Sequence, residues 1–138
     1  MKICVIDGMG GGIGNALIRK IIAAFRDQVD IIALGTNAIA TAQMMKAGAN
    51  KGATGERAIM RTSSRVDVIV GPLAIVVPDA MMGELTPGMA SAVSTSEAKK
   101  ILVPLTQESI ELVGVTGEPL PHLVDQVVEI IKEMDSHV

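Results

Sequence analysis

KICVIDGMGGGIGNA, residues 2–16, is the stretch that decides the fold. Its first six residues form a short apolar run that ends at a cluster of glycines, which predicts a strand buried on both faces. Apolar residues then recur at helical spacing between Asn15 and Arg26, which predicts an amphipathic helix. A glycine-rich turn between a strand and a helix is typical of the ligand-binding edge of an α/β sheet.

The rest of the chain alternates in the same way. Apolar runs predict buried strands at residues 30–34, 66–70 and 101–105, and helical spacing or caps predict helices at 38–47, 87–98 and 119–134. Residues 48–55 predict a glycine-rich loop, 56–65 favour a short helix over a strand, and 71–85 are irregular. The run at 109–115 predicts a fifth strand. Because the turn before it, at 106–108, is so short, that strand should be antiparallel to its neighbour.

This alternation predicts a single Rossmann-like domain over residues 1–138. We expect a three-layer α/β sandwich, in which a mostly parallel sheet of about five strands carries helices on both faces.

The composition excludes several classes of protein. The chain has 138 residues, with 12 Lys and Arg against 15 Asp and Glu, 49% hydrophobic residues and 1% aromatic residues. These values exclude disorder and argue against a nucleic-acid partner. No apolar run approaches the roughly 20 residues that cross a bilayer, so no membrane partner is expected. The single cysteine, Cys4, lies in an apolar run, which predicts a buried thiol and a cytoplasmic protein.

The glycine loop, residues 8–14, is the centre of the candidate site. Glycines let an anion approach the main chain, and the following helix offers unpaired N–H groups at its first turn. The spacing fits G-x-x-x-G-x-G, similar to that of short-chain dehydrogenases, and fits neither G-x-G-x-x-G nor the P-loop. The alternative is a tight turn packed for structural reasons alone. The residues expected to hold a phosphate here are Asp7, Gly8, Gly10, Gly11, Gly12, Gly14 and Asn15.

Two polar loops extend the candidate site. Gly35-Thr36-Asn37 follow the second strand, and Gly48-Ala49-Asn50 end the next helix and could fold back towards the glycine loop. Their side chains offer neutral hydrogen-bonding groups to a ribose or phosphate, and the alternative is ordinary capping. No acid follows the second strand, where a dinucleotide fold would place one for the ribose, so a nicotinamide dehydrogenase is disfavoured.

Residues 8–16 resemble the first nucleotide loop of the FtsZ/tubulin family, G-x-G-G-G-G-G-N-A, with a departure at Ile13. Residues 33–38 and 47–50 resemble the second and third loops of that family, A-V-N-T-D-A and A-G-A-N. The resemblance implies that these loops hold a guanine nucleotide. Where that family has a fourth, glycine-rich phosphate loop, this chain departs from the pattern and has residues 71–75, of which Gly71-Pro72 join the candidate site. Over its whole length the chain resembles a short bacterial family catalogued as domain of unknown function 3842, through residues 6–8, 10–14, 34–40, 46–50 and 71–72.

Three functions follow from these patterns. The first is a small protein that binds a phosphorylated ligand, with a purine nucleotide (GTP/GDP or NAD(P)) and Mg²⁺ as the expected cofactors. The second is a small enzyme that acts on a phosphorylated metabolite, with Asp7 as Mg²⁺ ligand or acid. The third is an interaction subunit with a vestigial loop. Asp79 and Glu84 are candidate lid residues, no residues are spaced as ligands of a resident metal, and the high apolar fraction favours a homodimer.

Overall fold

The computed structural model describes residues 1–105 and 108–136, and it contains a parallel sheet with strand order β3-β2-β1-β4-β5. The five strands are β1 (Lys2–Asp7), β2 (Asp30–Gly35), β3 (Lys51–Thr54), β4 (Val68–Pro72) and β5 (Lys99–Val103). Every neighbouring pair in this sheet is parallel. The expected Rossmann-like α/β architecture is therefore confirmed.

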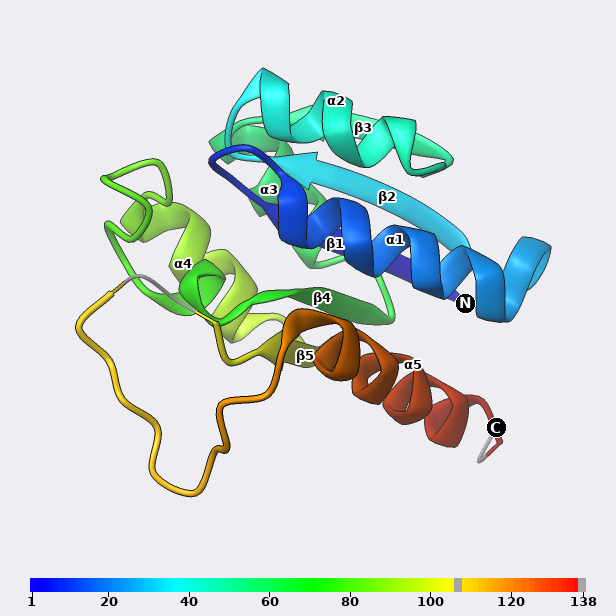
Figure 1. The fold of residues 1–138 in the computed structure, drawn as a ribbon. Coiled ribbons are helices and arrows are strands. Elements are labelled where there is room, and N and C mark those ends of the chain that lie inside the picture. The colour runs from blue at the N-terminus through cyan, green and yellow to red at the C-terminus, as the bar shows by residue number, and fades with distance from the viewer. Residues whose placement is uncertain (106–107, 137–138) are drawn as a thin grey trace.

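Helices cover both faces of the sheet (Figure 1). One face carries α1 (Gly12–Phe25), α2 (Ala38–Lys46) and α5 (Leu120–Ser136), and the other carries α3 (Glu56–Ser63) and α4 (Pro87–Thr95). Short 3₁₀ turns, η1 (Arg26–Gln28) and η2 (Leu73–Val76), follow α1 and β4. The helix favoured at 56–65 is confirmed as α3. None of the helices in the described residues is long and apolar enough to cross a membrane.

The central strand β1 is buried because it lies between two helical layers. Ile3 and Val5 belong to the core on the α1 side, whereas Cys4 and Ile6 belong to the core on the α3 side. The alternation explains why residues 3–6 are all apolar, since both faces of this strand are covered. Burial raises the pKa of the Cys4 thiol to about 12, so the expected buried thiol is confirmed and stays protonated.

Two sequence predictions about the sheet are wrong. Residues 109–115 form no strand, and Figure 1 shows residues 108–119 as a long loop that extends away from the sheet. The predicted antiparallel pairing therefore does not occur, and the first two residues of the predicted turn at 106–108 lie outside the described residues. The sheet still has five strands, because one that the sequence did not predict, β3, forms inside the predicted loop 48–55. It is an edge strand whose four residues are all exposed, so it lacks the apolar pattern of a buried strand.

The strand order places a topological switch point beside β1. The chain leaves β1 to build β2 and β3 on one side, and then crosses to build β4 and β5 on the other. Connections after β1 and β4 therefore diverge at the carboxyl edge of the sheet. Crevices at such points are where open α/β sheets bind their ligands.

Asn50 joins β2 and β3 at the opposite, amino edge. Its Oδ1 accepts from the Ile31 N–H at 2.8 Å, and its own N–H donates to the Ile31 carbonyl at 2.9 Å. Asn50→Ala leaves the Ile31 N–H without its acceptor, and we expect the free energy of unfolding to fall by about 1–3 kcal/mol in urea titrations. The exposed Lys51→Ala is a suitable control. An unchanged stability in Asn50→Ala would contradict this structural role.

Candidate functional site

Asp7 closes the glycine loop at the carboxyl end of β1. Its side chain is 4% exposed, and its two oxygens accept from the N–H groups of Gly8 at 2.8 Å and Gly14 at 2.7 Å. A further turn bond joins the Gly11 N–H to the Gly8 carbonyl at 2.9 Å. One carboxylate therefore ties together the two ends of the loop. Asp7 itself therefore has a structural role, as a cap of the loop N–H groups.

The environment of Asp7 acts on its pKa in opposite directions. Burial raises the pKa of the carboxyl above its ordinary value, and this effect is the largest. The N–H groups of Gly14, Gly8 and Ile13 lower it, and the nearby Glu84 raises it slightly further. The net direction is upward, so proton uptake by Asp7 accompanies folding at mildly acidic pH.

Three of the loop glycines are required by the protein's own packing. A Cβ on Gly8 would overlap the Thr36 hydroxyl and come within 2.5 Å of Met81 Sδ. Gly11 has a φ of 76° and leaves only 2.9 Å to the Ala40 backbone. A Cβ on Gly14 would come within 2.5 Å of Met44 Sδ and 3.0 Å of the Asp7 Cβ. These positions need glycine whether or not a ligand binds.

Gly10 and Gly12 differ from the other loop glycines. A Cβ on either would meet nothing within 4 Å, and neither has a left-handed φ. Their N–H groups have no hydrogen-bond partner among residues 1–105 and 108–136. The loop therefore presents two unpaired donors beside open space, at the first turn of α1.

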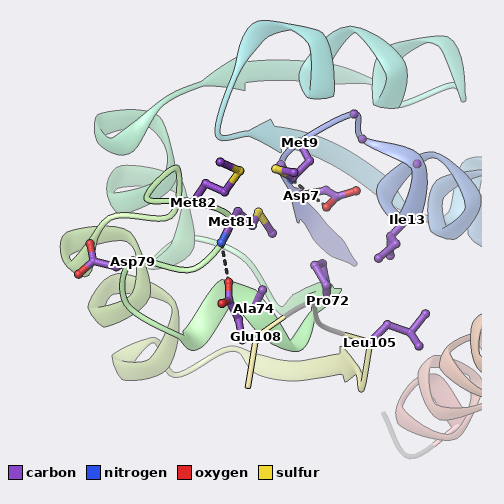
Figure 2. Close-up of a pocket in the computed structure, with 14 residues that line it drawn as sticks. Asp7, Met9, Ile13, Pro72, Ala74, Asp79, Met81, Met82, Leu105 and Glu108 are labelled. Carbon is purple, nitrogen blue, oxygen red and sulfur yellow. Dashed lines mark hydrogen bonds between the residues drawn. The ribbon is translucent and has the colours of Figure 1, made fainter. Parts of the chain in front are cut away.

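This space is a cavity of about 580 Å³ at the switch point (Figure 2). Such a volume lies in the range of small-molecule sites. The glycine loop forms one wall, the end of β4 with η2 forms another, and a methionine pair from the loop at residues 77–85 closes a third side. The lining residues are Asp7, Gly8, Met9, Gly10, Gly11, Gly12, Ile13, Pro72, Ala74, Asp79, Met81, Met82, Leu105 and Glu108.

Thr36 and Asn37 do adjoin the glycine loop, but both bind the Glu84 carboxylate. Glu84 Oε1 accepts from the Thr36 hydroxyl at 2.6 Å and from Asn37 Nδ2 at 2.8 Å. The Met9 N–H donates to the same oxygen at 3.1 Å. The Thr36 hydroxyl lowers the pKa of Glu84 most, burial opposes it as the next-largest effect, and Asn37 and Met9 lower the pKa further, so that the net direction is downward.

Asn37 also caps a helix. Its Oδ1 accepts from the Ala40 N–H at 2.8 Å, at the start of α2. The ordinary capping role considered from the sequence is therefore present beside the contact with Glu84.

The cavity is acidic. Asp7, Asp79 and Glu108 line it, Glu84 stands next to the loop, and no Lys or Arg occurs among the lining residues that the structure describes. Glu108 accepts from the Met81 N–H at 2.8 Å and so joins the 77–85 loop to the chain after β5. Figure 2 shows the exposed Asp79 carboxylate pointing away from Asp7. A bare anion would meet a negative field here.

Several predicted residues are not brought to the cavity. Asn15 joins helices, since its Nδ2 donates to the Gln43 carbonyl at 2.8 Å. Gly48, Ala49 and Asn50 lie at the amino edge of β2, as the bonds between Asn50 and Ile31 require. The structure therefore excludes these three from a site at the carboxyl edge.

Gly35 and Gly71 sit in strands and serve close backbone packing. A Cβ on Gly35 would overlap Thr41, and one on Gly71 would overlap the Ile6 carbonyl. Pro72 alone of the Gly71-Pro72 pair lines the cavity.

Sequence reasoning missed the wall built by Ala74, Met81, Met82, Leu105 and Glu108. These residues follow β4 and β5, so the strand order would have placed them at the same edge as the glycine loop. No local motif marks them. The described residues contain no cluster of three His, Cys, Asp or Glu side chains that could hold a metal.

The comparisons with known proteins give a family and nothing more. Residues 2–136 match the sequence profile of a protein family described as "Domain of unknown function (DUF3842)". The match spans almost the whole chain. Neither the curated proteins nor the solved structures contain a match to this chain.

The raised pKa of Asp7 has a measurable consequence for stability. Since folding raises this pKa, the folded state binds more protons than the unfolded state between the two values, and stability falls as pH rises through that window. Asp7→Asn should lack this fall. It should also be less stable near neutral pH by about 1–3 kcal/mol, because one loop N–H then faces the amide NH₂ group.

Urea unfolding of both proteins from about pH 4 upwards tests the prediction. The lowered pKa of Glu84 gives a dependence of the opposite sign, in which stability is lost as pH falls, but it is present in both proteins and cancels in their difference. A wild-type stability that rises with pH relative to Asp7→Asn would show that the loop N–H groups outweigh burial.

Proposed function

The chain belongs to the DUF3842 family, and we propose that it is a binding protein for a phosphorylated ligand, a purine nucleotide with Mg²⁺, held by the glycine loop at the switch-point cavity. The observation that carries the proposal is the pair Gly10 and Gly12. Packing accounts for glycine at positions 8, 11 and 14, whereas nothing in the protein occupies the space beside Gly10 and Gly12. A ligand that approaches the main chain closely would account for both.

The donors at this point suit a phosphate. The N–H groups of Gly10 and Gly12 have no partner in the described chain, and Gly12 begins α1, where the helix dipole is positive. Asp7 supports the arrangement, because it occupies the N–H groups of Gly8 and Gly14 at the two ends of the loop and leaves those of Gly10 and Gly12 open.

The acidic lining makes a divalent cation part of the proposal. Carboxylates from Asp7 and Glu108 border the same space, and a phosphate without a counter-ion would be repelled by them. Mg²⁺ usually keeps several waters and reaches proteins together with substrate phosphates, so it does not need a cage of its own. A Mg²⁺–nucleotide complex fits these groups better than the free anion.

A purine nucleotide is favoured over a smaller phosphate for two reasons. The cavity of about 580 Å³ is larger than phosphate alone requires. The first and second loops of the resemblance to a guanine-nucleotide site also lie side by side, because Asn37 Nδ2 donates to the Met9 carbonyl and the Thr36 N–H donates to the Asp7 carbonyl. The third loop of that resemblance, at Asn50, is not part of the site.

No observation favours the enzyme alternative in which Asp7 acts as acid or metal ligand. Both Asp7 oxygens accept hydrogen bonds from the loop, and this use explains the residue. We propose a binding role on these grounds and place the protein in the cytoplasm, in keeping with its one unpaired, buried cysteine.

We also propose that the protein is a homodimer. The loop that follows β5 exposes four apolar side chains, Ile110, Leu112, Val113 and Val115, and Val113 is fully exposed. Light scattering should give twice the chain mass of 14.3 kDa. Val113→Asp should shift the protein towards monomer at micromolar concentration, whereas the neighbouring Glu111→Gln should not. A wild-type monomer would refute this part of the proposal.

Substitutions at the two open glycines test the binding function. In calorimetric titrations with Mg²⁺-ATP and Mg²⁺-GTP, Gly10→Ala and Gly12→Ala should lower affinity on the order of tenfold, because the new methyl group takes the space of the ligand. Gly12→Ala should not lower the melting temperature, since alanine in a helix is more stable than glycine by about 0.5–1 kcal/mol.

Gly117→Ala is the matched control. Gly117 also has open space around it and no left-handed φ, but it lies in the loop after β5. Equal affinity of all three variants and the wild type would argue that the glycine loop does not hold the ligand. No binding of either nucleotide to the wild type at millimolar concentration would refute the proposal.

A further inference from the structure

A second carboxylate stands at the end of β2, where the local sequence supplies none. The residues that follow β2 are Thr36 and Asn37, neither of which is acidic. Glu84 lies 48 positions after Thr36 in the chain and places its Oε1 between these two side chains and the Met9 N–H, at 2.6, 2.8 and 3.1 Å. The fold therefore brings an acid to the end of β2 from the loop that follows β4 in the chain.

The Glu84 carboxylate is held in place both by donors to its oxygen and by backbone hydrogen bonds within its own loop. Three donors converge on Oε1, and the 77–85 loop fixes the backbone through the Glu84 N–H to the Met81 carbonyl at 3.1 Å and the Leu85 N–H to the Ala80 carbonyl at 3.1 Å. Gly8 leaves room for it, since a Cβ there would be 3.2 Å from Oε1. No hydrogen bond from the described residues reaches the other oxygen, Oε2.

Glu84 borders a shallow groove that adjoins the glycine loop and is separate from the cavity at the switch point. The groove is lined by Met9, Gly10, Asn37, Ala38, Ile39 and Glu84. Met9 and Gly10 belong to both hollows, so one molecule can lie across the loop between them. Ile39 is 68% exposed and gives the outer part of the groove an apolar surface.

We propose that Glu84 is the specificity-determining residue for a ribose, and that it accepts hydrogen bonds from the ribose hydroxyls of a nucleotide whose phosphates lie on Gly10 and Gly12. This inference rests on the proposed function and deepens it. In dinucleotide-binding folds an acid after the second strand has this task, and here a residue distant in sequence stands at the same place. The base then lies in the apolar part of the groove, on Ile39.

The charge of Glu84 supports this role. The Thr36 hydroxyl, with Asn37 and Met9, lowers the pKa of the carboxyl, which is therefore ionised at neutral pH. An ionised carboxylate only accepts hydrogen bonds, so it selects the donor hydroxyls of a ribose. It also opposes a phosphate at the same position, which favours the sugar there and the phosphates over the loop.

The test compares nucleotides that differ only in one sugar hydroxyl. Calorimetric titrations of the wild type, Glu84→Gln and Glu97→Gln use Mg²⁺-ATP, Mg²⁺-GTP and their 2′-deoxy forms. We expect the wild type to bind a ribonucleotide about ten- to hundredfold more tightly than its deoxy form, as for a hydrogen bond to a charged group. Glu84→Gln keeps an acceptor for the three donors and should reduce that ratio to about fivefold or less.

Glu97→Gln controls for charge. It makes the same change of side chain and removes one negative charge at an exposed position that lines neither the cavity nor the groove, and it should keep the wild-type ratio. Equal binding of ribo and deoxy forms to the wild type overturns the ribose role and leaves the nucleotide-binding proposal standing. The same holds if Glu84→Gln binds both forms more tightly by an equal factor, since Glu84 would then block the site. No binding of any of the four nucleotides overturns the proposed function itself.

Discussion

A single buried carboxylate sets the geometry of the site. Asp7 ends the central strand and accepts from the N–H groups at both ends of the glycine loop, so the chain can turn from β1 into α1 within a few residues. The cost of burying the carboxyl is visible in its raised pKa. As a result, the N–H groups of Gly8 and Gly14 are occupied by Asp7, whereas those of Gly10 and Gly12, two residues that line the cavity, have no partner in the described chain.

Asp7 and Glu84, the two acids beside the glycine loop, have different environments in the protein. Burial outweighs the donors at Asp7 and raises its pKa, whereas three donors outweigh burial at Glu84 and lower its pKa. Asp7 is thus a structural group inside the turn, and Glu84 is a charged group at its rim. This difference assigns them different roles although both border the same loop. On the proposed function, an anionic ligand would need a cation on the cavity side, because no basic side chain lines the described wall.

The parts of the structure that could be predicted are those encoded by neighbouring residues. The buried strand at residues 2–7, the glycine turn and α1 follow from one continuous pattern. β3 could not be found in this way, because an exposed edge strand of Lys51-Gly52-Ala53-Thr54 has no apolar alternation. Residues 109–115 have a strand-like composition but no partner strand. Asn50 looked like a ligand group because its motif resembled one, whereas its contacts with Ile31 place it at the other edge. The position of Glu84 beside Thr36 depends on tertiary structure alone.

The glycines of the loop fall into two groups, those that the fold requires and those that it would allow to be replaced. Gly11 and Gly14 are fixed by a left-handed φ and by contact with Met44, so substitution there would be costly with or without a ligand. Gly12 is different: it begins a helix with free space around it, where alanine would be more stable by about 0.5–1 kcal/mol. Packing within the described residues therefore gives no reason for glycine at this position. On the proposed function, a ligand that approaches the main chain closely supplies that reason, because it requires that the first turn of α1 stay bare.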